Sequence, residues 1–335
     1  MSAEVRVAVR RALARHRSAS VIVACSGGAD SLALARPVAQ ESVRADVHAV
    51  AVVVDHGLQV GSRAVAQRAA GQCRDLGLEA HVVAVEVNLA GEGIEAAARE
   101  ARYAALESAA DAYGADAILL GHTLDDQAET VLIRLTRGSG ARSLAGMASV
   151  AGRLVRPLLG ISRATVRASV SDLDAWEDPH NVDDSMLRPR VRHELIPVLA
   201  DVLGPGAVAA LARTAALLRA DADALDAWAD REFASIASIE KDWVDLPVDA
   251  LSAVPEAIRM RLIRRACITA GSPAGALTFD HVVAIGELVS NWRGQGAVSV
   301  PGPVTVERRY DRLRMCAGGA SSRLRRPRAA RACRH

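Results

Sequence analysis

The chain has 335 residues, half of them hydrophobic and only 3% aromatic, so one large domain or two ordinary ones can form around a core of Ala, Val, Leu and Ile. The net charge of +2 by itself points to no charged partner. The five cysteines lie far apart without a Cys-x-x-Cys pair, which argues against a zinc ribbon, an iron–sulfur site and a disulfide framework.

The N-terminal residues 1–17 carry arginines between their apolar positions and lack the uninterrupted apolar stretch of a signal peptide. No window of the sequence has enough consecutive apolar residues to cross a bilayer. The expectation is therefore a soluble, cytoplasmic protein with no membrane partner.

Residues 1–150 alternate between apolar segments and longer segments of helical character. The predicted strands are apolar on both faces, as in a buried parallel sheet, and they are Ser20–Cys25, Ala45–Val54, Ala80–Val85 and Ala115–Gly121. The predicted helices are Leu32–Val43, Ser62–Leu76, Ile94–Tyr113 and Leu124–Thr136. This alternation predicts an α/β fold with a doubly wound parallel sheet.

Ligands of such sheets bind beyond the carboxyl ends of the strands, so the residues that follow each strand are the candidates for a functional site. They are Ser26–Ser31, Asp55-His56-Gly57, Glu86–Gly93 and Gly121-His122.

The second half of the chain predicts the end of this domain and a smaller α+β domain. A fifth strand at Arg153–Leu159 and a helix at Arg163–Leu173 precede a polar segment, Asp174–Pro197, and a connecting helix at Ala207–Ala229. The small domain is expected to contain helices Glu256–Ala270 and Thr278–Val289 and strands Ala297–Val300, Val304–Arg308 and Arg312–Met315. The predicted boundaries are 1–203, 204–239 for the connecting helix, 240–316 for the small domain and 317–335 for a basic, disordered tail.

The hexapeptide Ser26-Gly27-Gly28-Ala29-Asp30-Ser31 follows the first strand and opens a helix, a layout that presents backbone N–H groups to a phosphate. It is not the kinase loop, which needs Gly-Lys-Ser/Thr, because the only lysine of the chain is Lys241. A carboxylate in the turn suggests a pyrophosphate held with a metal ion and chemistry at the α-phosphate. The alternative is an ordinary turn with a serine helix cap.

A second constellation, His122-Thr123-Leu124-Asp125-Asp126-Gln127-Ala128-Glu129-Thr130, follows the fourth strand. Asp126 and Glu129 are three residues apart and share a helix face. Such a pair can hold Mg²⁺ or the ammonium group of a substrate. A helix cap at Thr123, with acids favoured by the helix dipole, explains Asp125 and Asp126 but explains His122 and Glu129 less well.

Three weaker candidates remain. Arg99 and Arg102 share a helix face and either contact phosphates or a nucleobase, or pair with solvent-exposed acids. His56 stands at a strand end, where a loop residue is common. Trp176–Asn181, with Arg188, Arg190 and Arg192 after it, is either an acidic turn before a basic helix or an RNA-facing strip.

Taken together and in order, these segments resemble the PP-loop ATP pyrophosphatase superfamily and, within it, the tRNA(Ile)-lysidine synthetases. The residues that carry the resemblance are Ser26–Ser31, Asp55–Leu58, Ala98-Arg99, Arg102-Tyr103, Gly121-His122, Asp125–Thr130, Arg137–Gly140, Glu177-Asp178-Pro179 and Asn181. The likeness is strong over about residues 18–200 and looser in the second domain. Thr123, Met186 and Pro189 depart from the family pattern, which affects the tRNA-facing segment more than the ATP site.

The resemblance implies a two-step reaction. ATP adenylates the C2 oxygen of the wobble cytidine in an isoleucine tRNA with a CAU anticodon, and the ε-amine of free L-lysine then displaces AMP. The residues expected to bind ATP are Ser26, Gly27, Gly28, Ala29, Asp30, Ser31 and His56. The expected catalytic residues are Asp30, Arg102, His122, Asp126 and Glu129, with Mg²⁺ at Asp30 and Asp126. The small domain and the basic tail would bind tRNA, and the expected assembly is a homodimer.

Two other functions stay open at this point. One is a different adenylating PP-loop enzyme, such as a tRNA thiolase, although the scattered cysteines count against it, or an amide-forming synthetase, for which no ammonia-supplying motif is present. The other is a non-catalytic ATP- or RNA-binding module, in which Asp126 and Glu129 are dispensable.

Overall fold

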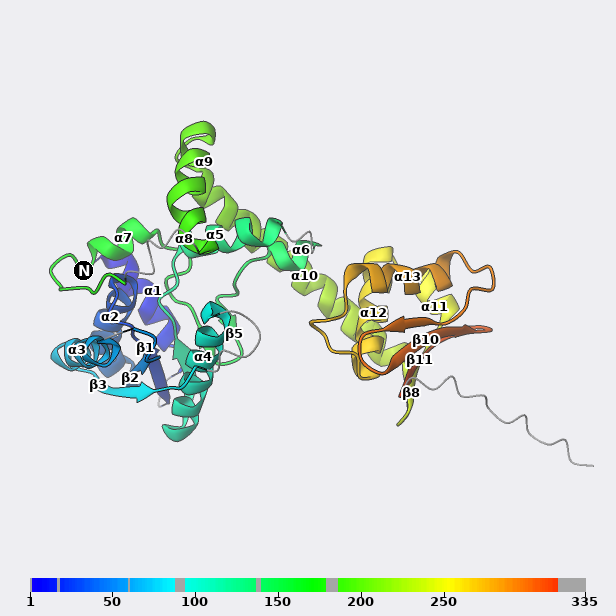
Figure 1. The fold of residues 1–335 in the computed structure, drawn as a ribbon, viewed down its shortest axis with the longest axis horizontal. Helices are drawn as coiled ribbons and strands as arrows, with labels where there is room; N and C mark the ends of the chain where they lie inside the picture. Colours follow the sequence, from blue (N-terminus) through cyan, green and yellow to red (C-terminus); the bar gives the residue numbers. More distant parts are fainter. Residues whose placement is uncertain are drawn as a thin grey trace, which may run out of the picture. The chain divides into compact units, whose positions relative to one another are not determined.

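The computed structural model describes residues 2–16, 19–59, 61–87, 94–136, 140–178 and 186–318. The chain divides into two compact units, residues 1–219 and 220–335 (Figure 1). The division falls inside helix α10 (Ala207–Ile236), the helix expected to connect the domains.

The first unit is built on a six-stranded sheet whose strand order is β3-β2-β1-β4-β6-β5. Neighbouring strands are parallel except that β5 runs antiparallel to β6. The strands are β1 (Ser20–Ala24), β2 (His48–Asp55), β3 (Glu79–Ala84), β4 (Ala115–Leu119), β5 (Val150–Ala151) and β6 (Leu154–Val155). This order reverses direction from β1, which confirms the predicted doubly wound sheet.

Helices cover both faces of this sheet (Figure 1). Val21 and Val23 of β1 pack in one core with α1 (Ala3–Leu13), α2 (Ala29–Ala45) and α3 (Ser62–Asp75). Ile22, which points the other way, packs against α4 (Ile94–Ala112). Alternate residues of a strand face opposite sides, so an uninterrupted apolar run is what a sheet covered on both faces requires.

The end of the first unit differs from the prediction. The expected strand at Arg153–Leu159 is a two-residue strand paired with the short β5, and the expected helix at Arg163–Leu173 ends at Ala168, as α7 (Arg163–Ala168). Helices occupy the end of the polar segment and continue beyond it: α8 (Leu187–Arg190), a π-helical turn (Val191–Leu195) and α9 (Ile196–Leu203). Two further helices complete the unit, α5 (Leu124–Leu135) and α6 (Gly140–Leu144).

The second unit contains a five-stranded antiparallel sheet of order β7-β8-β11-β10-β9. The three predicted strands are present as β9 (Val298–Val300), β10 (Val304–Arg309) and β11 (Arg312–Ala317), and both predicted helices as α12 (Glu256–Thr269) and α13 (Phe279–Ser290). Three elements of this unit were not predicted: β7 (Ser238–Ile239), β8 (Trp243–Pro247) and α11 (Val248–Ala253).

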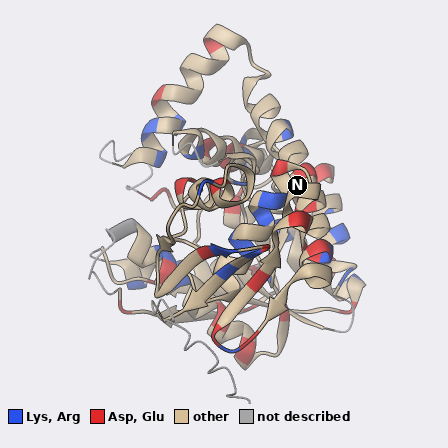
Figure 2. Cartoon of the chain, turned by 90° about the vertical axis from the view of Figure 1, so that its right-hand side faces the viewer, with Lys and Arg blue, Asp and Glu red and all other residues tan. Residues whose placement is uncertain are grey.

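Opposite charges face each other across the strands of this small sheet (Figure 2). Arg314 of β11 donates two hydrogen bonds, at 2.7 and 2.6 Å, to Asp245 of β8, which is buried. The guanidinium also lies 4.2 Å from the ring centre of Trp243. Leu262, Ile285, Val306 and Leu313 form the core on the other face.

Within the described residues, no single helix is both long and apolar enough to cross a membrane. The helical segments Leu187–Leu203 and Ala207–Ile236 reach that length and composition only when taken together, and they are bent by 99° to one another.

Candidate active site

The hexapeptide forms a closed turn between β1 and α2. Gly27 has a φ of +81°, and Gly28 is the last extended residue before the helix. The Ser31 hydroxyl accepts a hydrogen bond from the Ser26 N–H at 3.1 Å and donates one to the Gly28 carbonyl at 2.8 Å. These bonds fix the turn at the N-terminus of α2, where backbone N–H groups and the helix dipole favour a phosphate.

Two constraints favour glycine at position 27: its backbone conformation and the close packing of its neighbours. A Cβ on this residue would lie 2.9 Å from the Cβ of Ala69, so α3 packs directly against the turn. The Trp176 N–H donates to the Gly27 carbonyl at 2.9 Å and holds the other side.

We expect Gly27→Ala to lower the free energy of unfolding by about 2–4 kcal/mol, because it adds a clash to the cost of a left-handed residue. Gly61→Ala is the matched control, since Gly61 has a φ of +86° but nothing within 4 Å of an added Cβ. The control should lose only about 1–2 kcal/mol. Urea unfolding measures both, and equal losses would show that Ala69 does not crowd the turn.

Helix α5 begins with a cap at Thr123, the alternative explanation for the acids of its first turn. Asp126 Oδ2 accepts hydrogen bonds from the Thr123 N–H and hydroxyl, both at 2.8 Å. The remaining oxygen, Oδ1, faces away from the cap toward arginines, so Asp126 both caps the helix and belongs to a charged cluster. Glu129, one turn later, is completely buried.

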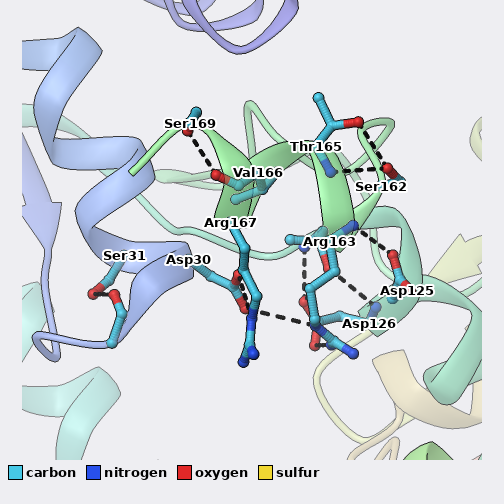
Figure 3. A network of polar contacts seen from close by, with 12 residues as sticks. Asp30, Ser31, Asp125, Asp126, Ser162, Arg163, Thr165, Val166, Arg167 and Ser169 are labelled. Atoms are coloured by element: carbon cyan, nitrogen blue, oxygen red, sulfur yellow. Dashed lines mark hydrogen bonds and ion pairs between the residues drawn. The ribbon is translucent and has the colours of Figure 1, made fainter. Parts of the chain in front are cut away.

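Two arginines from distant segments neutralise this acidic pair. Arg163, at the start of α7, lies 2.8 Å from Asp126 (Figure 3). It also lies 3.0 Å from Glu129. Arg192, in the π-helical turn, lies 3.4 Å from Asp126 and 2.8 Å from Glu129. The Arg163 N–H also donates to Asp125 at 2.7 Å, which joins the start of α7 to the start of α5.

Asp30 extends the cluster to the phosphate loop. Its Oδ2 lies 3.7 Å from Arg163 and its Oδ1 lies 3.9 Å from Arg167, which stands beside it (Figure 3). A Cβ on Gly121 would lie 2.8 Å from the Asp30 carbonyl, so the end of β4 touches the start of α2. The loop and the acidic pair are thereby held side by side at the carboxyl edge of the sheet.

Burial and charge set opposite pKa shifts in these acids. Burial raises the pKa of Asp30, with Arg163 opposing it. Burial also acts on Asp126, but Arg163 and the hydrogen bonds from Thr123 outweigh it, so the pKa of Asp126 is lowered. Asp126 is therefore a firmly ionised carboxylate, and Asp30 is the more readily protonated one.

Both candidate histidines are neutral at physiological pH. Burial lowers the pKa of His122 to about 3, with contributions from Arg156, Arg102 and Arg99 against Asp126. Burial and Arg102 lower the pKa of His56 as well. Arg102 thus lies near both imidazoles. A pKa of about 3 makes His122 a weak proton acceptor near pH 7, and its neutral ring is suited to hydrogen bonding instead.

Buried polar atoms without a hydrogen-bond partner concentrate at this edge. Of six such side-chain atoms in the described part of the chain, five belong to residues of this region: Asp30 Oδ1, His56 Nδ1, His122 Nδ1, Arg156 Nε and Arg163 Nε. Native proteins satisfy nearly all buried polar atoms, so such a concentration marks a place where a ligand supplies the partners.

The structure therefore places all the predicted site residues in one region. Three arginines of the site were not among the predicted site residues: Arg156, inside the predicted fifth strand, and Arg163 and Arg167, in the helix predicted after it. Arg192 was expected either at the start of a basic helix or in an RNA-facing strip, and in the structure it pairs with Glu129. The predicted segments 137–139 and 179–181 lie outside the described residues, as do 88–93 and the tail from 319.

Asp30 fits a magnesium ligand better than Asp126 does. The buried Oδ1 of Asp30 accepts no hydrogen bond, and Mg²⁺ is usually held by one or two carboxylates together with substrate phosphates. Both oxygens of Asp126 already face Thr123 or an arginine. No group of three His, Cys, Asp or Glu side chains suited to a metal occurs in the segments that the structure describes.

Comparison with known proteins gives the same order of domains. Residues 1–199 match the PP-loop domain family, and residues 246–314 match the TilS substrate binding domain. The U34-tRNA thiolase NcsA from Methanococcus maripaludis aligns with a TM-score of 0.54 at 21% identity, covering 64% of this chain and 79% of that one, which is a likeness of fold alone.

Proteins with similar sequences have names that state an activity as well as a domain. A tRNA(Ile)-lysidine synthase of Thermobifida fusca (strain YX) is 55% identical over 302 residues, which cover 89% of this chain and 92% of the relative. One of Streptomyces coelicolor (strain ATCC BAA-471 / A3(2) / M145) is 51% identical, covering 88% of this chain and 84% of the relative. These relatives are similar over most of their length, and the PP-loop family match covers more than half of this chain. The chain therefore belongs to the tRNA(Ile)-lysidine synthase family of PP-loop proteins.

Proposed function

We propose that this protein is a ligase that joins lysine to C2 of the wobble cytidine in a CAU-anticodon isoleucine tRNA, forming lysidine at the expense of ATP. The observation that carries the proposal is the meeting of the phosphate loop with the buried Asp126–Glu129 pair at one sheet edge. The names of its relatives supply the substrate and the product.

The geometry suits adenylation. Backbone N–H groups at the start of α2 would hold the phosphates of ATP, and Arg102 would contact the reacting nucleotides, where negative charge grows at the α-phosphate. Mg²⁺, held by Asp30 and those phosphates, would neutralise part of that charge. The cytidine C2 oxygen bonds to the α-phosphorus, and pyrophosphate leaves.

The second step needs a lysine amine without its extra proton. The ε-ammonium gives a proton to a nearby carboxylate or to His122, and Asp126 and Glu129 are the acids placed to hold the amine. The amine then forms the C2–N bond and AMP leaves with the oxygen. Lysine must enter a cluster in which these acids pair with Arg163 and Arg192, so its binding rearranges those pairs.

The substrate binding domain family match supports tRNA contact through the small domain at 240–316. A homodimer and a cytoplasmic location complete the proposal, and both remain predictions.

Mass spectrometry of a CAU-anticodon isoleucine tRNA, incubated with the protein, ATP and lysine, tests the proposal. The expected result is a mass gain matching lysidine at the wobble base, together with AMP and pyrophosphate. Pyrophosphate release without this gain would indicate a different acceptor, as in a thiolase-like enzyme. ADP as the product would contradict adenylation, and no turnover at all would favour a non-catalytic binding module.

A further inference from the structure

Arg156 is a buried arginine with no acidic partner among the described residues. Its side chain is only 7% exposed, and its one hydrogen bond to a described residue runs from Nη1 to the Ala148 carbonyl at 2.8 Å. Its Nε is buried and has no acceptor. By contrast, Arg163 nearby pairs with three carboxylates. Burying an unpaired charge costs free energy of desolvation, so we expect an anion to bind this guanidinium.

The position of Arg156 puts it inside the site rather than beside it. It directly follows β6, which pairs with β4 through Ile118 and Leu154, and the Leu120 N–H donates to the Val155 carbonyl at 2.9 Å. His122 therefore leaves β4 at the same edge where Arg156 leaves β6. The imidazole Nδ1 of His122 is also buried without a partner, so two unsatisfied groups end neighbouring strands.

The phosphates of ATP are not the natural anion here. The phosphate loop follows β1, and β4 separates β1 from β6, so Arg156 is two strand spacings, or about 10 Å, from the loop across the sheet. Between them, at the end of β4, stand the acids Asp126 and Glu129. The edge thus offers, beside the acids that hold the side-chain amine, a separate anion site that suits the α-carboxylate of a free amino acid.

We propose that Arg156 binds the α-carboxylate of the amino acid substrate and thereby positions it for attack through its side-chain amine. This inference rests on the proposed lysine ligation. A phosphate of the tRNA shares the same anionic chemistry, and the experiment separates these two sources.

The test compares lysine with lysinamide, which keeps both amines but has no carboxylate, in wild-type protein and in Arg156→Gln. For the wild type, lysinamide should have a KM about 10- to 100-fold above that of lysine, as expected for one charged hydrogen-bonded contact. Arg156→Gln should raise the KM of lysine by the same factor and leave that of lysinamide nearly unchanged. Arg156→Lys, which keeps the charge, should recover part of the preference.

Arg153→Gln is the matched control, because Arg153 lies on the same hairpin but is 42% exposed and pairs with Glu107 and Asp111. It should keep the full preference for lysine. Urea unfolding checks that each variant is folded. If Arg156→Gln does not fold, the comparison of lysine with lysinamide is made with Arg156→Lys. Equal effects on lysine and lysinamide would overturn the proposal. So would a rise in the KM of tRNA alone, which would assign the anion to RNA. Absence of lysidine from the wild type would instead refute the proposed function.

Discussion

Asp126→Asn is expected to reduce the rate of lysidine formation by about 10²- to 10⁴-fold, the range for loss of a group that takes part in proton transfer or in holding the reacting amine. Asparagine keeps the shape and one oxygen for the Thr123 cap, but it removes the negative charge that faces Arg163 and Arg192. Glu129 is then the only carboxylate of the pair. Single-turnover measurement of AMP release and of lysidine separates the two steps.

The neighbouring acid supplies the control for this prediction. Asp125 has the same chemistry and the same helix turn, but its Oδ2 accepts a hydrogen bond from the backbone N–H of Arg163 at 2.7 Å. Asp125→Asn should therefore cost less than about tenfold in rate, because an amide oxygen can still accept that bond. Similar losses in both variants would mean that the acids matter only for the junction of α5 and α7. Normal turnover in Asp126→Asn would favour the non-catalytic function.

The fold was predictable where apolar runs were long enough to be buried on both faces. The run Val21-Ile22-Val23 has only one stable environment, a strand between two helical layers, and the same holds for β2 and β4. The strand β8 was missed for the converse reason. Asp245 interrupts its apolar pattern, and this carboxylate is buried only because Arg314, 69 residues later, covers it. No local sequence pattern predicts a partner that lies so far along the chain.

The site was predictable in part for the same reason. Strand ends and the helix start at Thr123 are local signals, and they located the phosphate loop and the acidic pair. The arginines that neutralise the pair come from far along the chain, 37 residues away for Arg163 and 66 for Arg192, counted from Asp126. Their roles depend on how α7 and the π-helical turn pack against α5. Arg192 therefore had the appearance of one more surface arginine in a basic segment.

Arg163→Met is expected to lower the free energy of unfolding by about 3–5 kcal/mol, because it leaves buried carboxylates without their shared partner. Methionine keeps much of the apolar stem, so the loss is one of charge. Arg163 is 12% exposed and contacts Asp30, Asp126 and Glu129, whereas the variant leaves Arg192 to face the last two. The three acids then repel one another at neutral pH.

The pH dependence of this loss distinguishes an electrostatic cause from a packing defect. In the wild type, the lowered pKa of Asp126 means that its ionised form stabilises the fold above the ordinary aspartate value of 3.8, and this contribution fades as the pH falls below it. The difference between wild type and Arg163→Met should therefore be largest near pH 7 and shrink toward pH 3. Arg167→Met is the matched control on the same helix, because Arg167 is 51% exposed and lies 3.9 Å from Asp30, so its loss should be below about 1 kcal/mol. Urea unfolding at several pH values measures all three proteins. If the free energy of unfolding lost in Arg163→Met stays constant with pH, the loss comes from packing. The charged cluster then has no stabilising role.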